Sequence, residues 1–185
     1  MREVFQKRTG KFETDDPWFE ARTRAFWDDA LATQGLAPLA AAALDGEAQP
    51  FVQLVRRFAG AHRGLFEVAE ADANGARLVD VWSGAELLVR HVDEAQRLAL
   101  EHADGLMDAR VIAASDDALF VLPGALHHSA DASEAAMKVV EAARTRELRT
   151  GEVLDALMRM ELVFRSSSRV KAAFAYRVDS LPRSA

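Results

Sequence analysis

The sequence predicts an α+β fold in which N-terminal helices precede a β-rich centre and further helices follow it. Apolar residues recur at helical spacing before residue 62 and again after residue 123. Between them, five short alternating segments are separated by turn residues. These segments are too closely linked for parallel crossovers, so we expect a small five-stranded antiparallel barrel or curled sheet.

The length and composition indicate one globular domain. The chain has 185 residues, of which 50% are hydrophobic and 28% are charged, a balance that allows a proper core. We therefore expect a single domain over residues 1–185, with a helical part (1–62), a β-rich core (63–122) and a mainly helical part (123–185).

The first third is expected to form three helices. Asp15-Asp16-Pro17 is a helix-start signal, and Gly35 marks the end of this first helix. An Ala-rich helix to about residue 44 and a helix from Pro50 follow. Five large apolar residues are expected to be buried and to tie these helices to the centre: Phe26, Trp27, Phe51, Leu54 and Phe58.

The central strands are expected over 65–71, 77–82, 86–92, 106–114 and 118–122. Asn74-Gly75 indicates a hairpin between the first two strands, because Asn-Gly tolerates positive φ. Asp93-Glu94-Ala95-Gln96 resembles a capping box and predicts a helix between the third and fourth strands.

The last third is predicted to contain two helices, one capped by Asp131 or Ser133 and one by Thr150. Residues 170–178 then alternate in polarity, which favours a strand, whereas their Ala content favours a helix. We predict a strand that pairs with the chain's own sheet or with a partner chain.

Charge is unevenly distributed along the chain. Residues 12–156 carry 26 acidic and 13 basic side chains, whereas both ends are basic. An acidic body repels nucleic acid at long range, so a nucleic-acid partner is not expected. Nucleic-acid binding through the basic C-terminal segment is kept as an alternative hypothesis.

The absence of cysteine excludes disulfides, thiolate metal sites and thiol nucleophiles. No apolar run approaches the roughly 18 residues that span a bilayer. No apolar signal core follows the first residues. These features predict a cytoplasmic protein that does not associate with membranes.

Few residues suggest catalysis. The sequence has no phosphate-binding glycine loop and no nucleophile elbow. His127, His128 and Asp131 form the densest group of potential ligands, and imidazole with carboxylate suits Zn²⁺ or Fe²⁺. A metal-dependent enzyme that uses these three residues is one alternative. Neighbouring histidines on a strand diverge, however, so a polar loop before a capped helix is favoured. We expect no metal and no cofactor.

The remaining candidates are binding residues. Trp82 is expected to end a strand beside a tight turn, where an aromatic side chain on a barrel rim can serve as a ligand platform. Packing of Trp82 within the core is the competing interpretation. Lys171, Tyr176 and Arg177 lie in the alternating segment and are further candidates. The sequence thus favours a non-catalytic binding or assembly module whose partner is a protein, either itself or another chain.

Three segments carry a resemblance to known sequences. They are residues 62–68 (HRGLFEV), 78–84 (LVDVWSG) and 104–111 (DGLMDARV). This pattern resembles the middle of uncharacterised bacterial proteins that are often associated with SEC-C motifs. The resemblance spans residues 62–111 and implies a shared small-barrel core. The Cys-rich zinc-binding tail of SEC-C proteins is absent, so no metal function is carried over.

Overall fold

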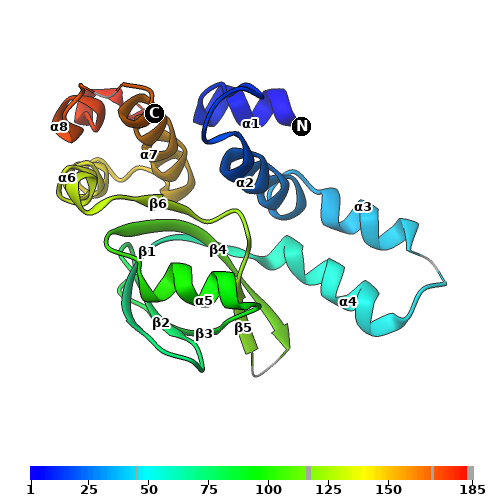
Figure 1. The fold of residues 1–185 in the computed structure, drawn as a ribbon. Coiled ribbons are helices and arrows are strands. Elements are labelled where there is room, and N and C mark those ends of the chain that lie inside the picture. The colour runs from blue at the N-terminus through cyan, green and yellow to red at the C-terminus, as the bar shows by residue number, and fades with distance from the viewer. Residues whose placement is uncertain (45, 116–117, 168, 183–185) are drawn as a thin grey trace.

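The computed structural model describes residues 1–44, 46–115, 118–167 and 169–182. It confirms the α+β class, with helices on both sides of a central sheet in the sequence (Figure 1). The N-terminal helices are α1 (Arg2–Thr9), α2 (Phe19–Ala32), α3 (Leu36–Ala43) and α4 (Gln49–Arg57), followed by the short 3₁₀ turn η1 (Phe58–Gly60). The C-terminal helices are α6 (Ala130–Thr145), α7 (Thr150–Arg165) and α8 (Ala172–Ala175), followed by η2 (Val178–Ser180).

The sheet and one helix lie between these groups. The strands are β1 (His62–Ala71), β2 (Ala76–Asp80), β3 (Glu86–Arg90), β4 (Leu106–Ser115), β5 (Ala118–Val121) and β6 (Leu126–His128). Helix α5 (Glu94–Glu101) connects β3 to β4. Its cap is the predicted one, because the Asp93 side chain accepts a hydrogen bond from the Gln96 amide at 2.7 Å.

The sheet differs from the prediction in strand number and direction. Among the described residues it has six strands in the order β1-β2-β3-β5-β4-β6, and β1 also pairs with β4. The pairings of the first five strands therefore form a closed cycle. β3 and β5 run parallel, since α5 and β4 lie between them in the chain, so the predicted antiparallel sheet is a mixed one. The sixth strand, β6, replaces the loop expected after Pro123-Gly124 and pairs with β4.

The Asn74-Gly75 turn joins β1 and β2 as predicted, but for a different reason. Gly75 is not among the glycines with positive φ. The turn is instead closed by Asp72, whose Oδ1 accepts hydrogen bonds from the amides of Asn74 and Gly75 at 2.7 and 3.1 Å. Glycine is required at position 75 because the backbone of Val89 lies close to it: a Cβ there would be 2.3 Å from the carbonyl oxygen of Val89.

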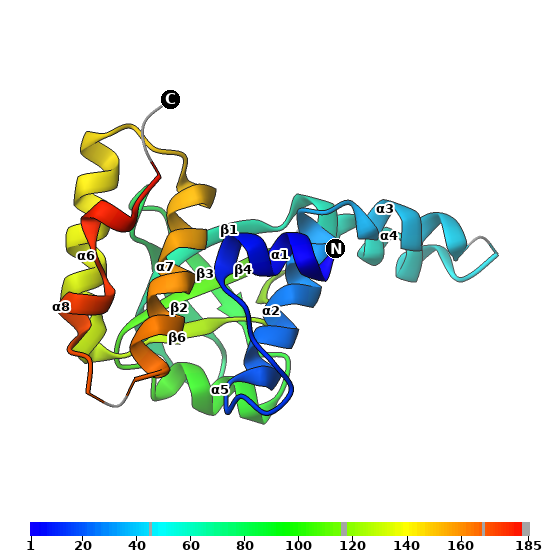
Figure 2. The same cartoon turned by 90° about the horizontal axis from the view of Figure 1, so that it is seen from above.

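The apolar core has three parts. Inside the cycle of strands lies one cluster, which includes Phe66, Leu78 and Met107. A second cluster lies between the sheet and helices α6, α7 and α8. A third joins α1 and α2 to α7 through Phe5 and Met158. Figure 2 shows α6 and α7 side by side over one side of the sheet, with α1 and α2 next to α7.

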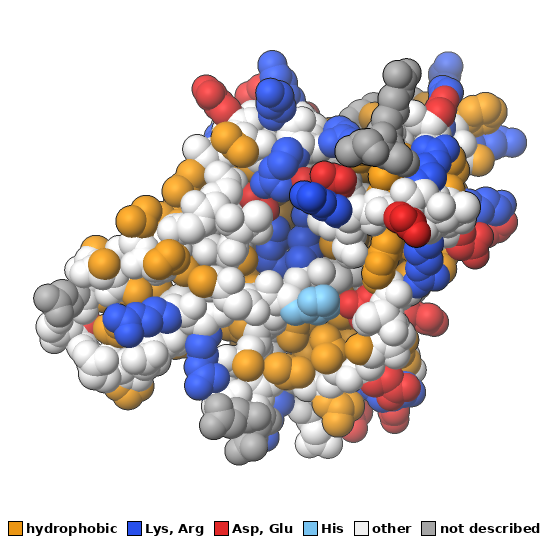
Figure 3. All heavy atoms as spheres, turned by 180° about the vertical axis from the view of Figure 1, so that it is seen from behind, with side chains coloured by type: hydrophobic (Ala, Val, Ile, Leu, Met, Phe, Trp, Pro, Cys, Tyr) orange, Lys and Arg blue, Asp and Glu red, His pale blue; other side chains and the backbone are white. Residues whose placement is uncertain are grey.

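The N-terminal helices do not bury all the residues expected to tie them to the centre. Phe26 is buried, but Trp27 and Phe51 are each about half exposed, at 52% and 51%. Leu54 and Phe58 are partly buried. The reason is that α3 and α4 pack on each other and project away from the sheet (Figures 1 and 2). Hydrophobic side chains remain visible along this projection, at the left of Figure 3. Helix α2 begins at Phe19, two residues after Pro17, and α1 was not predicted.

The predicted C-terminal strand over 170–178 is wrong. This segment forms the short helix α8 and the turn η2, and it packs against α6 and α7. Ala175 and Tyr176 are buried, whereas Phe174 is 72% exposed. The contacts of Tyr176 with the helices, rather than a sheet edge, decide the conformation. None of the helices in the described ranges is long and apolar enough to cross a membrane.

Candidate functional site

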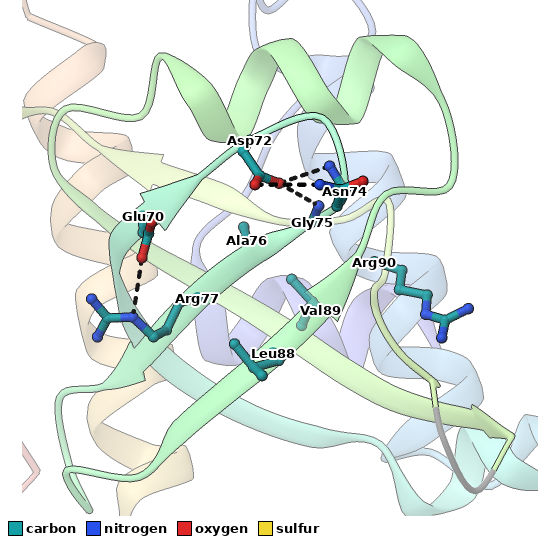
Figure 4. Close-up of a pocket in the computed structure, with 9 residues that line it drawn as sticks. All are labelled: Glu70, Asp72, Asn74, Gly75, Ala76, Arg77, Leu88, Val89 and Arg90. Carbon is teal, nitrogen blue, oxygen red and sulfur yellow. Dashed lines mark hydrogen bonds and ion pairs between the residues drawn. The ribbon is translucent and has the colours of Figure 1, made fainter.

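One candidate surface of the sheet lies on β2 and β3. A hollow of about 440 Å³ extends from the Asp72–Gly75 turn along these two strands (Figure 4). Ala76 and Val89 border it, although their side chains point the other way, into the buried cluster inside the cycle of strands. Leu88 lies beside them and is 73% exposed, the largest exposed fraction among the large apolar residues described. A single exposed leucine is ordinary on a protein surface, so what distinguishes this one is its place beside a hollow and two arginines.

Charged side chains surround this leucine. Arg77, which pairs with Leu88 across the two strands, lies 3.7 Å from a Glu70 oxygen and 3.4 Å from a Glu86 oxygen. Arg90 is exposed, its side chain points away from the other residues in Figure 4, and its guanidinium has no hydrogen bond or ion pair with any described residue. This hydrophobic and charged surface, formed by Glu70, Arg77, Leu88 and Arg90, is called the β2–β3 face below.

The turn at one end of the face is rigidly held. Asp72 accepts amide hydrogen bonds from Asn74 and Gly75, and these bonds lower the pKa of its carboxyl group. Its own amide donates to the Gly75 carbonyl at 2.9 Å, and its carbonyl is bonded to a ring nitrogen of His91 at 2.7 Å. The hollow is therefore bounded at this end by a turn whose backbone is held by several hydrogen bonds.

Trp82 lies in the turn between β2 and β3, at the end of β2 where the sequence places it. It is only partly exposed and packs against the cluster below α6 and α7. The guanidinium of Arg144 lies 5.5 Å from the centre of its ring and also donates to its carbonyl oxygen at 3.0 Å. The guanidinium of Arg144 on α6 thus lies over the indole. This contact favours the competing interpretation, in which Trp82 is a packing residue.

The three C-terminal candidates lie in one segment but have different surroundings. Tyr176 is 4% exposed, and its hydroxyl is hydrogen-bonded to Nδ1 of His128 at 2.7 Å. Burial raises the pKa of Tyr176 above its usual value. Lys171 and Arg177 are exposed, and Arg177 donates from Nε to Asp179 at 2.9 Å. Tyr176 is therefore part of the interior, while the two basic residues face solvent.

The structure separates the potential metal ligands. His128 is buried beside Tyr176, and burial lowers its pKa, so the ring is neutral at pH 7. His127, its neighbour on β6, is half buried, and Asp131 is exposed in the first turn of α6. Within the described ranges no group of three His, Asp or Glu side chains is placed to hold a metal ion.

A buried ion-pair network joins the sheet to the helices. Arg63 on β1 bonds Asp108 on β4 and Asp155 on α7, and Arg8 on α1 bonds Asp155 and Asp29 at 2.7 and 2.5 Å. Arg110 on β4 bonds Asp29 at 2.7 Å, and Arg22 on α2 bonds Glu161 on α7 at 2.6 Å. Every buried charge named here has a partner, so the network is best understood as structural.

Sequence reasoning missed both this network and the β2–β3 face. Acidic residues such as Asp29 and Asp155 look like surface residues in the sequence, because aspartate is rarely buried unless it is paired, and the pairing partners are far away along the chain. For the face, the signal was the alternation Glu86, Leu88, Arg90, which puts one leucine among outward-facing charges.

Comparisons with protein-family models, with curated proteins and with solved structures find no match to this chain. The resemblance of residues 62–111 to SEC-C-associated proteins therefore stays a prediction.

Proposed function

We propose that the protein is a non-catalytic binding module that receives a segment of a partner protein on its β2–β3 face. The observation that carries the proposal is Leu88, an apolar side chain 73% exposed above a hollow of about 440 Å³. Interfaces combine such apolar anchors with arginine, and Arg77 and Arg90 flank the leucine. No described residue pairs with Arg90, so an acidic side chain of the partner would meet a free cation.

The order of the strands supports the same face. The cycle β1-β2-β3-β5-β4, with a helix between β3 and β4, is the arrangement of OB-fold barrels. In that fold, strands 2 and 3 and the loop between strands 1 and 2 form the ligand surface. We accordingly interpret the cycle of strands as a small barrel. Fold alone does not define a ligand, and the side chains on the face decide between candidates.

Those side chains favour protein over nucleic acid. Single-stranded nucleic acids bind OB-type faces by stacking on aromatic rings, and no aromatic residue lines this hollow. The face also carries Glu70, and Glu86 pairs with Arg77 beside it; both carboxylates repel phosphates. A cytoplasmic location is part of the proposal, supported by the absence of cysteine.

Photo-crosslinking from the face tests this proposal. A photoreactive amino acid replaces Leu88 in one variant and Val163, which is 53% exposed on α7, in the control. In the native host, position 88 should give a discrete protein adduct that position 163 does not give. The substitution Arg90→Glu should weaken binding of the isolated partner by about tenfold or more.

Two results would contradict the proposal. A crosslink at position 88 that nuclease removes would identify nucleic acid as the ligand. Identical adduct patterns at positions 88 and 163 would show that the β2–β3 face has no specific partner.

A further inference from the structure

A second pocket lies on a different part of the molecule, between α5, the start of α2 and the segment that leads into β6. Its volume is about 310 Å³. The buried side chains of Leu100, Met107 and Val121 lie at its walls, together with alanines of α5. Small-molecule sites are typically pockets of this kind, with apolar walls and a few placed polar groups.

Two of the four polar residues that line the pocket are already engaged. The Gln96 side chain donates from Nε2 to the Val121 carbonyl at 2.9 Å and accepts from the Val92 amide at 3.0 Å. The Asp93 carboxylate caps α5, and the partial positive charge of the helix N-terminus offsets its charge. Both side chains hold the wall of the pocket in place, and few of their hydrogen-bonding groups remain for a ligand.

The other two polar residues are available. The ring of His127 forms no hydrogen bond with any residue in the part of the chain that the structure describes. Burial, followed by the nearby charge of Arg165, lowers the pKa of His127, so at pH 7 the ring is neutral and offers one donor and one acceptor. Among the described residues Arg24 pairs with Glu20 alone, at 3.6 Å, and both side chains are largely exposed. An exposed ion pair of this kind contributes little to stability, so the guanidinium of Arg24 can leave Glu20 and turn toward a ligand.

We propose that this pocket binds a small apolar carboxylic acid, with its hydrocarbon part against the walls and its carboxylate on Arg24 and His127. Arginine and a neutral imidazole N–H are suitable donors to the two oxygens of a carboxylate. Burial of a hydrocarbon chain against the apolar walls contributes favourable binding free energy. This site is separate from the β2–β3 face and does not depend on the proposed protein partner.

Calorimetric titration of the full chain with matched probes tests the site. Octanoate and phenylacetate are the carboxylate probes, and octanol and phenylethanol are their neutral counterparts. The carboxylates should bind about ten- to a hundredfold more tightly than the alcohols, because only they make charge-assisted hydrogen bonds. Arg24→Gln should reduce this preference to near unity without changing the melting temperature. The control Arg169→Gln, also at an exposed arginine, should leave it unchanged.

A second variant tests the pocket independently of charge. Ala99→Leu places a larger side chain at the wall and should weaken binding of acids and alcohols alike. The proposal is overturned if none of the probes binds at millimolar concentration. It is also overturned if acids and alcohols bind equally, or if Arg24→Gln and Arg169→Gln have the same effect.

Discussion

Arg63 on β1 donates two hydrogen bonds to the carboxylate of Asp108 on β4, from Nε to Oδ1 at 3.0 Å and from Nη2 to Oδ2 at 2.8 Å. Its third guanidinium nitrogen bonds Asp155 on α7 at 2.7 Å. Burial alone would lower the pKa of Arg63, but the two carboxylates raise it above the usual value. One arginine thus joins two strands and a helix.

The first prediction removes one charge from this site. Asp108→Asn leaves the guanidinium of Arg63 buried with one carboxylate fewer, so the free energy of unfolding should fall by about 3–5 kcal/mol. Urea denaturation measures the change. The control is Glu134→Gln, which removes an exposed ion pair with Lys138 and should leave the stability almost unchanged. Equal stability of the two variants would show that the network does not contribute to folding.

The second prediction concerns the β1–β2 turn. Gly75→Ala should lower stability by about 1 kcal/mol or more, and Gly75→Val by more, because the new Cβ would overlap the Val89 carbonyl. The cause is this steric contact and not a positive φ. Gly60→Ala is the matched control, since no atom lies within 4 Å of its added Cβ. Melting temperatures compare the variants, and an unchanged value for Gly75→Ala would disprove the close approach.

The third prediction follows from Asp28, a buried residue of α2. Burial raises the pKa of its carboxyl group from 3.8 to about 6, although the Gly124 amide and Arg110 act in the opposite direction. A raised pKa means that the folded state holds the proton more tightly than the unfolded state does. The contribution of Asp28 to stability is therefore lost as the pH rises from about 4 to about 6.

Asp28→Asn should remove this pH dependence. The amide oxygen can still accept the hydrogen bond that Gly124 donates to Asp28 at 2.8 Å. The variant and the wild type should be similarly stable near pH 4, whereas above pH 6 the variant should be more stable by up to about 3 kcal/mol. Guanidinium denaturation across this range gives the difference. A difference that does not change with pH would show that the carboxyl group titrates normally.

The fourth prediction addresses the buried His128–Tyr176 pair. Nε2 of His128 has no partner among the described residues, so Tyr176 supplies the one hydrogen bond of the ring. Tyr176→Phe leaves both ring nitrogens unpaired and should cost about 1–3 kcal/mol. Phe174→Leu, at a neighbouring exposed position, should change stability by less than about 0.5 kcal/mol. Similar unfolding midpoints for the two variants would argue against a structural role for the pair.

The sequence predicted local features well where one short segment decides the outcome. The Asp93 cap, the hairpin at Asn74-Gly75 and the α+β class are all present. The segment 170–178 failed because its alternation is compatible with a strand, while burial of Tyr176 against His128 selects a short helix. Such a contact between β6 and α8 cannot be inferred from spacing along the chain.

The candidate site was predicted less well, for a related reason. Tyr176 and Trp82 were binding candidates, and packing was the competing interpretation for Trp82; in the structure Tyr176 is buried on His128 and Trp82 lies under Arg144. Leu88 was not singled out, because one apolar residue among charges is unremarkable until the strand is seen to face solvent. The exposure of a side chain is a property of the assembled fold, and the proposed β2–β3 face rests on the exposure of Leu88.

The packing of α1 on α7 affects how the chain folds during synthesis. Phe5 and Phe12 lie in a cluster with Met158, and Arg8 bonds Asp155, so the first helix is covered by residues made roughly 150 positions later. At about 5–20 residues per second, the ribosome takes on the order of ten seconds to reach α7. During that interval two phenylalanines near the N-terminus lack part of their cover. In the nascent chain α1 is therefore accessible to chaperones until α7 has been translated, and only then does α1 complete its packing.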